Sequence, residues 1–185
     1  MPEKALYKKE ILLPLGSALL LSDGEKLKGL WLIGQKHFGG HFSNLSGIPA
    51  EETLPVFLKT ETFLARYFAG EPVSPDGIPL APDGTPFQEL VWKELLRIPY
   101  GETKSYGSLA REVAAALHRS SMSAQAVGSA VGRNPISILI PCHRVVGAGG
   151  NLIGYAGGLD KKAYLLSLEG RSRPDKRSDM YPDKN

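Results

Sequence analysis

Cys142 is the only cysteine of the chain and lies in the stretch IPCHRVV, between a proline and a histidine. The thiolate is the reactive form of cysteine, and a neighbouring base or positive charge favours it. His143 supplies a base and Arg144 a positive charge at the next two positions. These neighbours indicate a nucleophilic thiol. The alternative is an inert core residue, which is the usual state of a lone cysteine.

A base that serves Cys142 needs a third group to orient it. Adjacent residues of an extended segment point to opposite faces, so His143 is expected to act through one intervening water. Glu169 is the candidate for the third group, because it comes at the end of a predicted helix, where the helix dipole disfavours an acid. The alternative is a solvated glutamate beside Arg171.

The apolar, β-branched run that begins at Ile136 predicts a buried strand, which places Cys142 at its end, where a loop begins. Two helices are predicted before it, over residues 105–118 and 124–134, with the turn RSSMS between them. Asn134 is expected to close the second helix in a left-handed conformation. This pair is typical of a helix-turn-helix, and its small side chains fit either tight helix packing or close approach to nucleic acid.

Two further helices flank this region. The first is predicted to begin with Thr85 as N-cap, Pro86 at the first helical position and Gln88 completing a capping box, and to end near residues 98–99. The last helix, DKKAYLLSLEG, is predicted to start at Asp160 as its cap and to stop at Gly170.

The front of the chain predicts strands and one helix. Two apolar runs surround Asp23-Gly24, which is a hairpin signal. Residues 53–71 predict a helix whose inward face holds Leu54, Phe57, Leu58, Leu64 and Phe68. The stretch 70–84 contains four prolines and three glycines and is interpreted as a linker between two lobes.

The expected fold is therefore a two-lobe α/β arrangement. A small N-terminal α+β domain with an antiparallel sheet covers 1–80, and a mostly helical C-terminal domain with the helix-turn-helix covers 85–170. Residues 171–185 carry eight charged side chains without apolar periodicity and are predicted to be a disordered tail.

Composition limits the class of protein. The chain has 185 residues, of which 42% are hydrophobic, and no apolar run approaches the roughly 18 residues of a membrane span. We expect no signal peptide and, with one cysteine, a reduced cytoplasmic setting. Residues 85–170 hold nine Lys and Arg against six Asp and Glu, whereas 1–84 hold eight against ten. The positive charge in the half that carries Cys142 fits an anionic partner.

The stretch NPISILIPCHRVVGAGGNLIGYAGGLDKKAYLLSLEG strongly resembles the O6-alkylguanine-DNA alkyltransferases, also called methylated-DNA–protein-cysteine methyltransferases. The motif Pro-Cys-His-Arg-Val at 141–145 carries the resemblance, which runs from about Pro86 to Gly170 and is weak over 1–80. It implies a DNA repair protein that transfers the methyl or alkyl group of O6-methylguanine irreversibly to its own Cys142, once per molecule.

By position, the resemblance also implies site roles. Cys142 resembles the alkyl acceptor. His143 and Glu169 resemble the water-linked relay that deprotonates it, and Asn134 resembles the hinge asparagine that orients this network. Tyr106 resembles the tyrosine that rotates the target phosphate and assists the departure of guanine, although a core position on its helix also fits it.

Further positions are assigned to the substrate and to DNA. The substrate pocket and its covering loop GYAGG are matched by Val145, Tyr155, Ala156 and Gly157. Contact with DNA and base flipping are assigned to Ser123, Gln125, Ala126 and Arg133.

This sequence departs from the family at three points. Gln125 stands where the family often places an intercalating arginine, so the charge and stacking surface of a guanidinium are missing. Ala156 replaces a serine of some members and leaves a backbone N–H to contact the O6 substituent. Only His37 and His41 are available for the zinc site of some members, so no metal is expected.

A methyl group on a base edge inside the duplex is reached only if the nucleotide leaves the stack, which costs a few kcal/mol. The expected partner is double-stranded DNA containing O6-alkylguanine. No nucleotide-cofactor signature is found, because GAGG opens no helix, so we expect no cofactor and DNA as the alkyl donor. We expect a monomer without membrane contact.

Two other functions use the same residues. A non-enzymatic lesion sensor would use the helix-turn-helix alone, and the presence of Cys142 argues against it. A thiol hydrolase or redox sensor would need an oxyanion site or a resolving cysteine, and no second cysteine exists.

Overall fold

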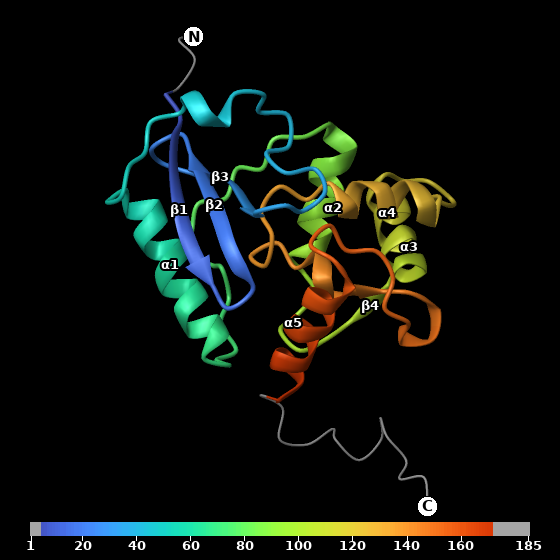
Figure 1. Ribbon diagram of the computed structural model, residues 1–185. Coiled ribbons are helices and arrows are strands. Elements are labelled where there is room, and N and C mark those ends of the chain that lie inside the picture. The colour runs from blue at the N-terminus through green and yellow to red at the C-terminus, as the bar shows by residue number, and fades with distance from the viewer. Residues whose placement is uncertain (1–4, 172–185) are drawn as a thin grey trace, which may run out of the picture.

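An antiparallel sheet forms the first part of the structure. The computed structural model describes residues 5–171, so the predicted tail lies outside the described residues apart from Arg171 (Figure 1). The strands β1 (Tyr7–Leu13), β2 (Gly16–Ser22) and β3 (Leu27–Leu32) pair in the order β1-β2-β3. The hairpin predicted around Asp23-Gly24 is confirmed as the β2–β3 turn, where Gly24 has a φ of 93°. A positive φ at this turn is a conformation that glycine adopts at little cost.

Helix α1 (Pro55–Phe68) lies beside the sheet (Figure 1). The face that it buries differs from the predicted one. The prediction was right for Phe57 and Leu64 but wrong for Leu58, whose side chain is 48% exposed. The aromatic residues Phe63 and Tyr67 occupy the inward face instead, and both are buried. The buried face of α1 is therefore set by its aromatic residues rather than by the first leucines of the helix.

The segment 69–85 connects α1 to the helical part of the protein and contains no helix or strand. It is nevertheless attached to the sheet, because Leu27 N–H donates to the carbonyl of Pro79 at 2.8 Å and Ala81 N–H donates to the carbonyl of Leu27 at 2.8 Å. The predicted linker thus runs along the start of β3. The division into domains at 1–80 and 85–170 stays a prediction.

The second part of the described chain consists mainly of helices. The α-helices are α2 (Pro86–Leu95), α3 (Tyr106–Ala116), α4 (Ala124–Gly132) and α5 (Leu159–Arg171). Short parallel strands β4 (Lys104–Ser105) and β5 (Val145–Val146) pair between them. Residues 5–171 also contain three single turns of 3-10 helix. In the second part these are η2 (Cys142–Arg144) and η3 (Ala148–Gly150), whereas η1 (Leu45–Gly47) lies in the first part, before α1.

The start of α2 is as predicted, because its cap depends only on local residues. Thr85 accepts from the N–H of Gln88 at 3.3 Å, and the Gln88 side chain accepts from the N–H of Thr85 at 2.9 Å. These bonds form the reciprocal capping box, with Pro86 at the first helical position. The helix itself ends at Leu95, before the predicted stop.

Helices α3 and α4 pack against one another, with residues 117–123 between them, in an arrangement compatible with a helix-turn-helix. Ser105 and Ser123 cap the two helices by accepting from N–H groups of their first turns. The left-handed conformation predicted for Asn134 is wrong, because Asn134 does not have a positive φ. Helix α4 ends at Gly132 and is followed by Arg133 as its C-cap, with a φ of −99°.

The chain before Cys142 is a turn and not the predicted strand. Only Ile136 makes a bridge, in parallel to Leu30 of β3, and the chain then folds back so that Ile140 N–H donates to the carbonyl of Ile136 at 3.1 Å. Ile138 adopts a φ of 72°, which is a strained conformation for a β-branched residue. Burial of Ile138 and its neighbours overrides the strand propensity of this run.

The ends of α5 also differ from the prediction. The helix begins at Leu159, so Asp160 lies in its first turn and not at its cap. Gly170 lies inside the helix, which continues to Arg171. An acid in the first turn still interacts favourably with the helix dipole. No helix within residues 5–171 is both long and apolar enough to cross a membrane.

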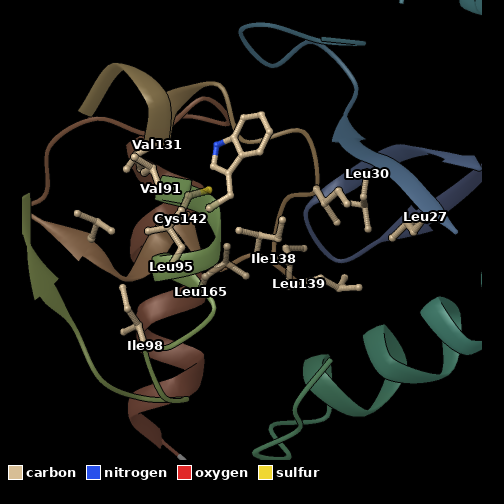
Figure 2. Packing of buried hydrophobic residues seen from close by; sticks show 14 of the residues in the cluster. Leu27, Leu30, Val91, Leu95, Ile98, Val131, Ile138, Leu139, Cys142 and Leu165 are labelled. Carbon is tan, nitrogen blue, oxygen red and sulfur yellow. The ribbon is translucent and has the colours of Figure 1, made fainter. Parts of the chain in front are cut away.

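One hydrophobic core joins the two parts of the protein. Leu30 N–H donates to the carbonyl of Pro135 and Ser137 N–H donates to the carbonyl of Leu30, each at 2.9 Å, so β3 and the turn before Cys142 share backbone hydrogen bonds. Figure 2 shows how the cluster continues from the sheet to the helices through Leu27, Leu30, Ile138, Leu139, Val91, Leu95 and Cys142. The position of the thiol therefore depends on both parts of the chain.

Candidate active site

Cys142 begins the 3-10 turn η2 and is 6% exposed. Its small exposed surface faces a pocket with a volume of about 170 Å³. The inner wall is formed by Cys142 with residues of α3, α4 and the loop before α5, and the outer wall includes the exposed residues Lys36 and His37. The thiol is thus buried on all sides except the one that opens into this pocket.

The surroundings of Cys142 act on its ionisation in opposite directions. Burial raises the pKa of the thiol, because a thiolate is poorly solvated in the core. A hydrogen bond from the Asn134 side chain and the positive charge of Lys162 oppose this rise. A base that takes the proton is therefore needed for the thiolate to form near neutral pH.

His143 and Glu169 are brought together, as the sequence predicted. Nε2 of His143 lies 2.6 Å from Oε1 of Glu169, and both side chains are buried. Burial lowers the pKa of His143, so its imidazole is neutral at neutral pH. The Nε2–H group donates to the carboxylate, and Nδ1 makes no hydrogen bond with any group of residues 5–171. Nδ1 thus keeps a free lone pair.

Glu169 is surrounded by donors and remains a carboxylate. Nε of Arg144 lies 2.9 Å from Oε2, the N–H of Gly101 donates to Oε2 at 2.9 Å, and the hydroxyl of Tyr67 donates to Oε1 at 2.7 Å. Burial alone would raise the pKa of Glu169, but the bonds with His143 and Arg144 outweigh it and hold the pKa at about 2. The solvated glutamate considered from the sequence is excluded, because Glu169 is 1% exposed.

Asn134 supports the turn that carries Cys142. Its Nδ2 donates to the carbonyl of Ile140 at 2.8 Å, and its Oδ1 accepts from the N–H of Ile136 at 3.0 Å. A hydrogen bond of the same side chain with Cys142 opposes the rise in the pKa of the thiol. The side chain thus links both ends of the turn to the thiol, although the residue lacks the predicted backbone conformation.

Tyr106 lies at the wall of the pocket and not only in the core. Its hydroxyl lies 3.3 Å from the carbonyl oxygens of both Ile153 and Gly154. Burial, together with the charge of a Cys142 thiolate, raises the pKa of Tyr106 to about 12. The phenol therefore stays protonated near neutral pH and remains a donor.

Lys162 is a residue of this site that the sequence analysis missed. Its ammonium group donates to the carbonyl oxygens of Val145, Ile153 and Gly154, at 2.5, 2.7 and 3.0 Å, and lies 5.8 Å from the centroid of the Tyr106 ring. Burial lowers its pKa to about 8, so the group is still charged at neutral pH. The available signal was a lysine three residues before Leu165, on the buried face of α5.

The predicted pocket residues separate into two groups. Tyr155 and Ala156 line the pocket, together with Gly154, and the hydroxyl of Tyr155 is buried without a partner among the described residues. Val145 and Gly157 do not line it. The carbonyl of Val145 instead holds Lys162, and a side chain at Gly157 would collide with the Tyr155 ring, 2.8 Å from its Cβ position.

The predicted DNA-contacting residues gather on the outer side of α4. Ser123, Gln125, Ala126 and Arg133 are all exposed, whereas Val127, Ala130 and Val131 of the same helix are buried. The small side chains of α4 allow tight helix packing and also leave an open outer surface. Helix α4 packs on α2 and α3 with one face and presents a surface free of bulky groups on the other. His37 and His41 lie outside any cluster of metal-ligating residues in 5–171, and the expected absence of metal stays a prediction.

Comparisons with known proteins identify relatives of this chain. Residues 86–171 match the family model of the DNA-binding domain of 6-O-methylguanine DNA methyltransferase. The methylated-DNA–protein-cysteine methyltransferase of Mycobacterium leprae is 44% identical over 84% of this chain and 87% of its own length. That of Haemophilus influenzae is 39% identical over 89% of this chain and 87% of its own.

Solved structures are also similar. The crystal structure of Mycobacterium tuberculosis OGT in complex with DNA superimposes with a TM-score of 0.78 and 39% identity, covering 91% of this chain and 96% of that one. The expected two-lobe fold with an antiparallel sheet and a helical second part is thereby confirmed. From its sequence, its fold and the residues around Cys142, the chain belongs to the methylated-DNA–protein-cysteine methyltransferase family.

Proposed function

We propose that this protein repairs double-stranded DNA by transferring the alkyl group of O6-alkylguanine to Cys142, irreversibly and once per molecule. The observation that carries the proposal is a buried thiol that opens only into a pocket lined by Tyr106, Tyr155 and Ala156 and is backed by the His143–Glu169 pair. The family to which the chain belongs supports the same reaction.

Deprotonation of Cys142 is the first step. Nδ1 of His143 accepts the thiol proton through one water, while its Nε2–H remains bonded to Glu169. Glu169 orients the imidazole and stabilises the imidazolium, and with its pKa at about 2 it does not itself take the proton. The positive charge of Lys162 and the amide of Asn134 stabilise the thiolate.

Alkyl transfer follows as an in-line displacement. The Sγ of Cys142 forms a bond to the alkyl carbon while the bond from that carbon to O6 of guanine breaks, and the electron pair stays on the base. The phenol of Tyr106 donates a proton to the departing guanine, which stays attached to its DNA strand, and recovers one from the imidazolium through solvent. The thiol proton thus ends on the restored guanine. The product is an S-alkylcysteine, a thioether with no acidic proton to restore the thiolate.

The base reaches the pocket by leaving the duplex. We assign insertion into the vacated space to Gln125, with Ser123, Ala126 and Arg133 contacting the backbone around it, because all are exposed on or beside α4. An extruded base is less costly when it is damaged or badly paired, which favours alkylated guanine. We also propose that the protein acts as a monomer in the cytoplasm, where its thiol stays reduced.

Intact mass spectrometry tests the proposal. Incubation with a duplex containing one O6-methylguanine is expected to add the mass of one methylene per protein molecule, mapped to Cys142. Cys142→Ser is expected to bind the same duplex with unchanged affinity and to gain no mass. A lesion-sensing protein would bind without any gain in mass, and a thiol hydrolase would turn over ester or peptide substrates, so either result would contradict the proposal.

A further inference from the structure

Tyr67 connects the N-terminal part of the protein to the candidate relay. It lies on α1, more than seventy positions before His143, and is fully buried. Its hydroxyl lies 2.7 Å from Oε1 of Glu169 and 3.3 Å from Nε2 of His143. The three groups therefore meet around one carboxylate oxygen, although they come from α1, η2 and α5.

The direction of these hydrogen bonds follows from the charges. Glu169 is a carboxylate and only accepts, so the Tyr67 O–H and the His143 Nε2–H both donate to Oε1. Burial and the nearby Glu169 charge raise the pKa of Tyr67 well above its ordinary value, so the hydroxyl keeps its proton. Arg144 also donates to Oε1, from Nη2 at 3.1 Å, so Tyr67, His143 and Arg144 share the negative charge of this oxygen.

Because Oε1 also accepts from Tyr67, its hydrogen bond with the imidazole of His143 is weaker. A carboxylate oxygen that already accepts a hydrogen bond is a poorer acceptor for the next one. Without the Tyr67 hydroxyl, Glu169 would stabilise the imidazolium form of His143 more strongly. The base would then be protonated, and unable to accept the thiol proton, up to a higher pH.

We propose that Tyr67 is a positioning residue for alkyl transfer, whose hydroxyl acts through Glu169 to hold His143 in the neutral, Nε2-protonated form that can deprotonate Cys142. The inference rests on the proposed function and assigns the N-terminal part a role in the chemistry. The charged and titratable groups facing His143 are Tyr67 of α1, Glu169 and Lys162 of α5, and Cys142 and Arg144 of η2.

A packing role for Tyr67 has to be separated from this one, because its ring also stacks on Phe63 with centroids 6.1 Å apart. Tyr67→Phe removes only the hydroxyl and keeps the ring. Phe63→Leu is the matched control, because it removes the stacking partner and leaves the hydroxyl in place. Thermal unfolding of the two variants separates the stability lost with the hydroxyl, in Tyr67→Phe, from the stability lost with packing, in Phe63→Leu.

The decisive measurement is the single-turnover rate of methyl transfer as a function of pH. Tyr67→Phe is expected to move the acidic limb of the profile to higher pH by about half a unit. The rate would then be about threefold lower below the midpoint and nearly unchanged on the plateau. Phe63→Leu is expected to leave the midpoint where it is. An unmoved midpoint in Tyr67→Phe, or an equal shift in both variants, overturns the inference.

Nitrogen NMR of His143 gives a second test that does not depend on activity. In the wild-type protein, the imidazole is expected to be Nε2-protonated at neutral pH and to titrate below its ordinary pKa of 6.5. An Nδ1-protonated ring would overturn the inference. If the proposed function itself fails, no methyl appears on Cys142, while the pKa of His143, compared by NMR between the wild type and Tyr67→Phe, still decides the role of Tyr67. An equal pKa of His143 in the two proteins overturns the inference.

Discussion

Arg144 and Glu169 form a buried ion pair in which Nε of Arg144 lies 2.9 Å from Oε2 and Nη2 lies 3.1 Å from Oε1. The Nη1 group of Arg144 donates to the carbonyl of Ile98 at 2.7 Å. The arginine that follows the Cys-His pair therefore supports the carboxylate, and the cation whose charge lowers the pKa of Cys142 is Lys162.

The Glu169 network makes the protein sensitive to acid. Because the folded pKa of Glu169, about 2, lies below its ordinary value of 4.5, its stabilisation is fully present above pH 4.5 and is lost as the pH falls toward 2. This shift corresponds to about 3 kcal/mol. The lowered pKa of His143 acts in the same direction below pH 6.5, because only the unfolded chain takes up that proton readily.

Urea unfolding across this pH range measures the effect. Glu169→Gln is expected to lose about 3–5 kcal/mol at neutral pH, because it leaves Arg144 buried without a negative partner. Between pH 4.5 and pH 2, the free energy of unfolding of the variant should also fall less than that of the wild type. Equal slopes of stability against pH in the two proteins would show that Glu169 is not the group responsible.

Lys162→Met is expected to impair both stability and alkyl transfer. The substitution leaves the carbonyl groups of Val145, Ile153 and Gly154 without their shared donor, at a cost of about 3 kcal/mol. It also removes a charge that stabilises the thiolate, so transfer at neutral pH should slow about tenfold.

Lys161→Met provides the control for this loss of charge. Among residues 5–171, Lys161 makes a long hydrogen bond of 3.4 Å to the carbonyl of Gly157, so the same change there should alter the transfer rate less than about twofold. Similar rates for the two variants, measured in single-turnover assays, would mean that the position of the ammonium group does not matter.

Gln125→Arg tests whether this exposed position of α4 enters the DNA. An arginine there adds a positive charge and a planar group that stacks on bases, so affinity for duplex DNA should rise about tenfold and depend more steeply on salt. Leu12→Arg adds the same charge on β1, where the side chain is 82% exposed. Fluorescence anisotropy with equal gains for both variants would indicate a general charge effect.

Thr85→Ala tests the capping box of α2. The substitution removes the acceptor for the Gln88 N–H and should cost about 1 kcal/mol of stability. Val91 and Leu95 of this helix pack in the core that also contains Cys142, so a less stable helix should lower the melting temperature. We expect little change in the transfer rate. A change in rate without a change in melting temperature would contradict this view of α2.

Local patterns predicted much of this fold, because caps and turns depend on a few neighbouring residues. The Thr85 capping box, the hairpin at Asp23-Gly24 and the proximity of His143 to Glu169 follow from such patterns or from the family resemblance. The turn before Cys142 could not be predicted from local patterns. Its β-branched residues favour a strand, whereas the left-handed conformation of Ile138 is imposed by tertiary packing.

Contacts between distant segments were also beyond the sequence patterns. Tyr67 was not among the residues predicted for the inward face of its helix, and its hydrogen bond to Glu169 spans 102 positions. The burial of Lys162 could not be predicted, because its helix carries several charged residues and because this burial depends on the loop folded over it. The Leu58 error shows the same limit, because periodicity does not say which of two adjacent stripes faces the sheet.

The backbone ladder between Leu30 and the turn before Cys142 has a consequence for limited proteolysis. A single cut in the segment 69–85 would divide the chain without dividing the fold, because β3 and residues 135–137 remain bonded across the cut. The two fragments should elute together from a sizing column in native buffer and separate in urea, and the nicked protein should still hold its thiol in place.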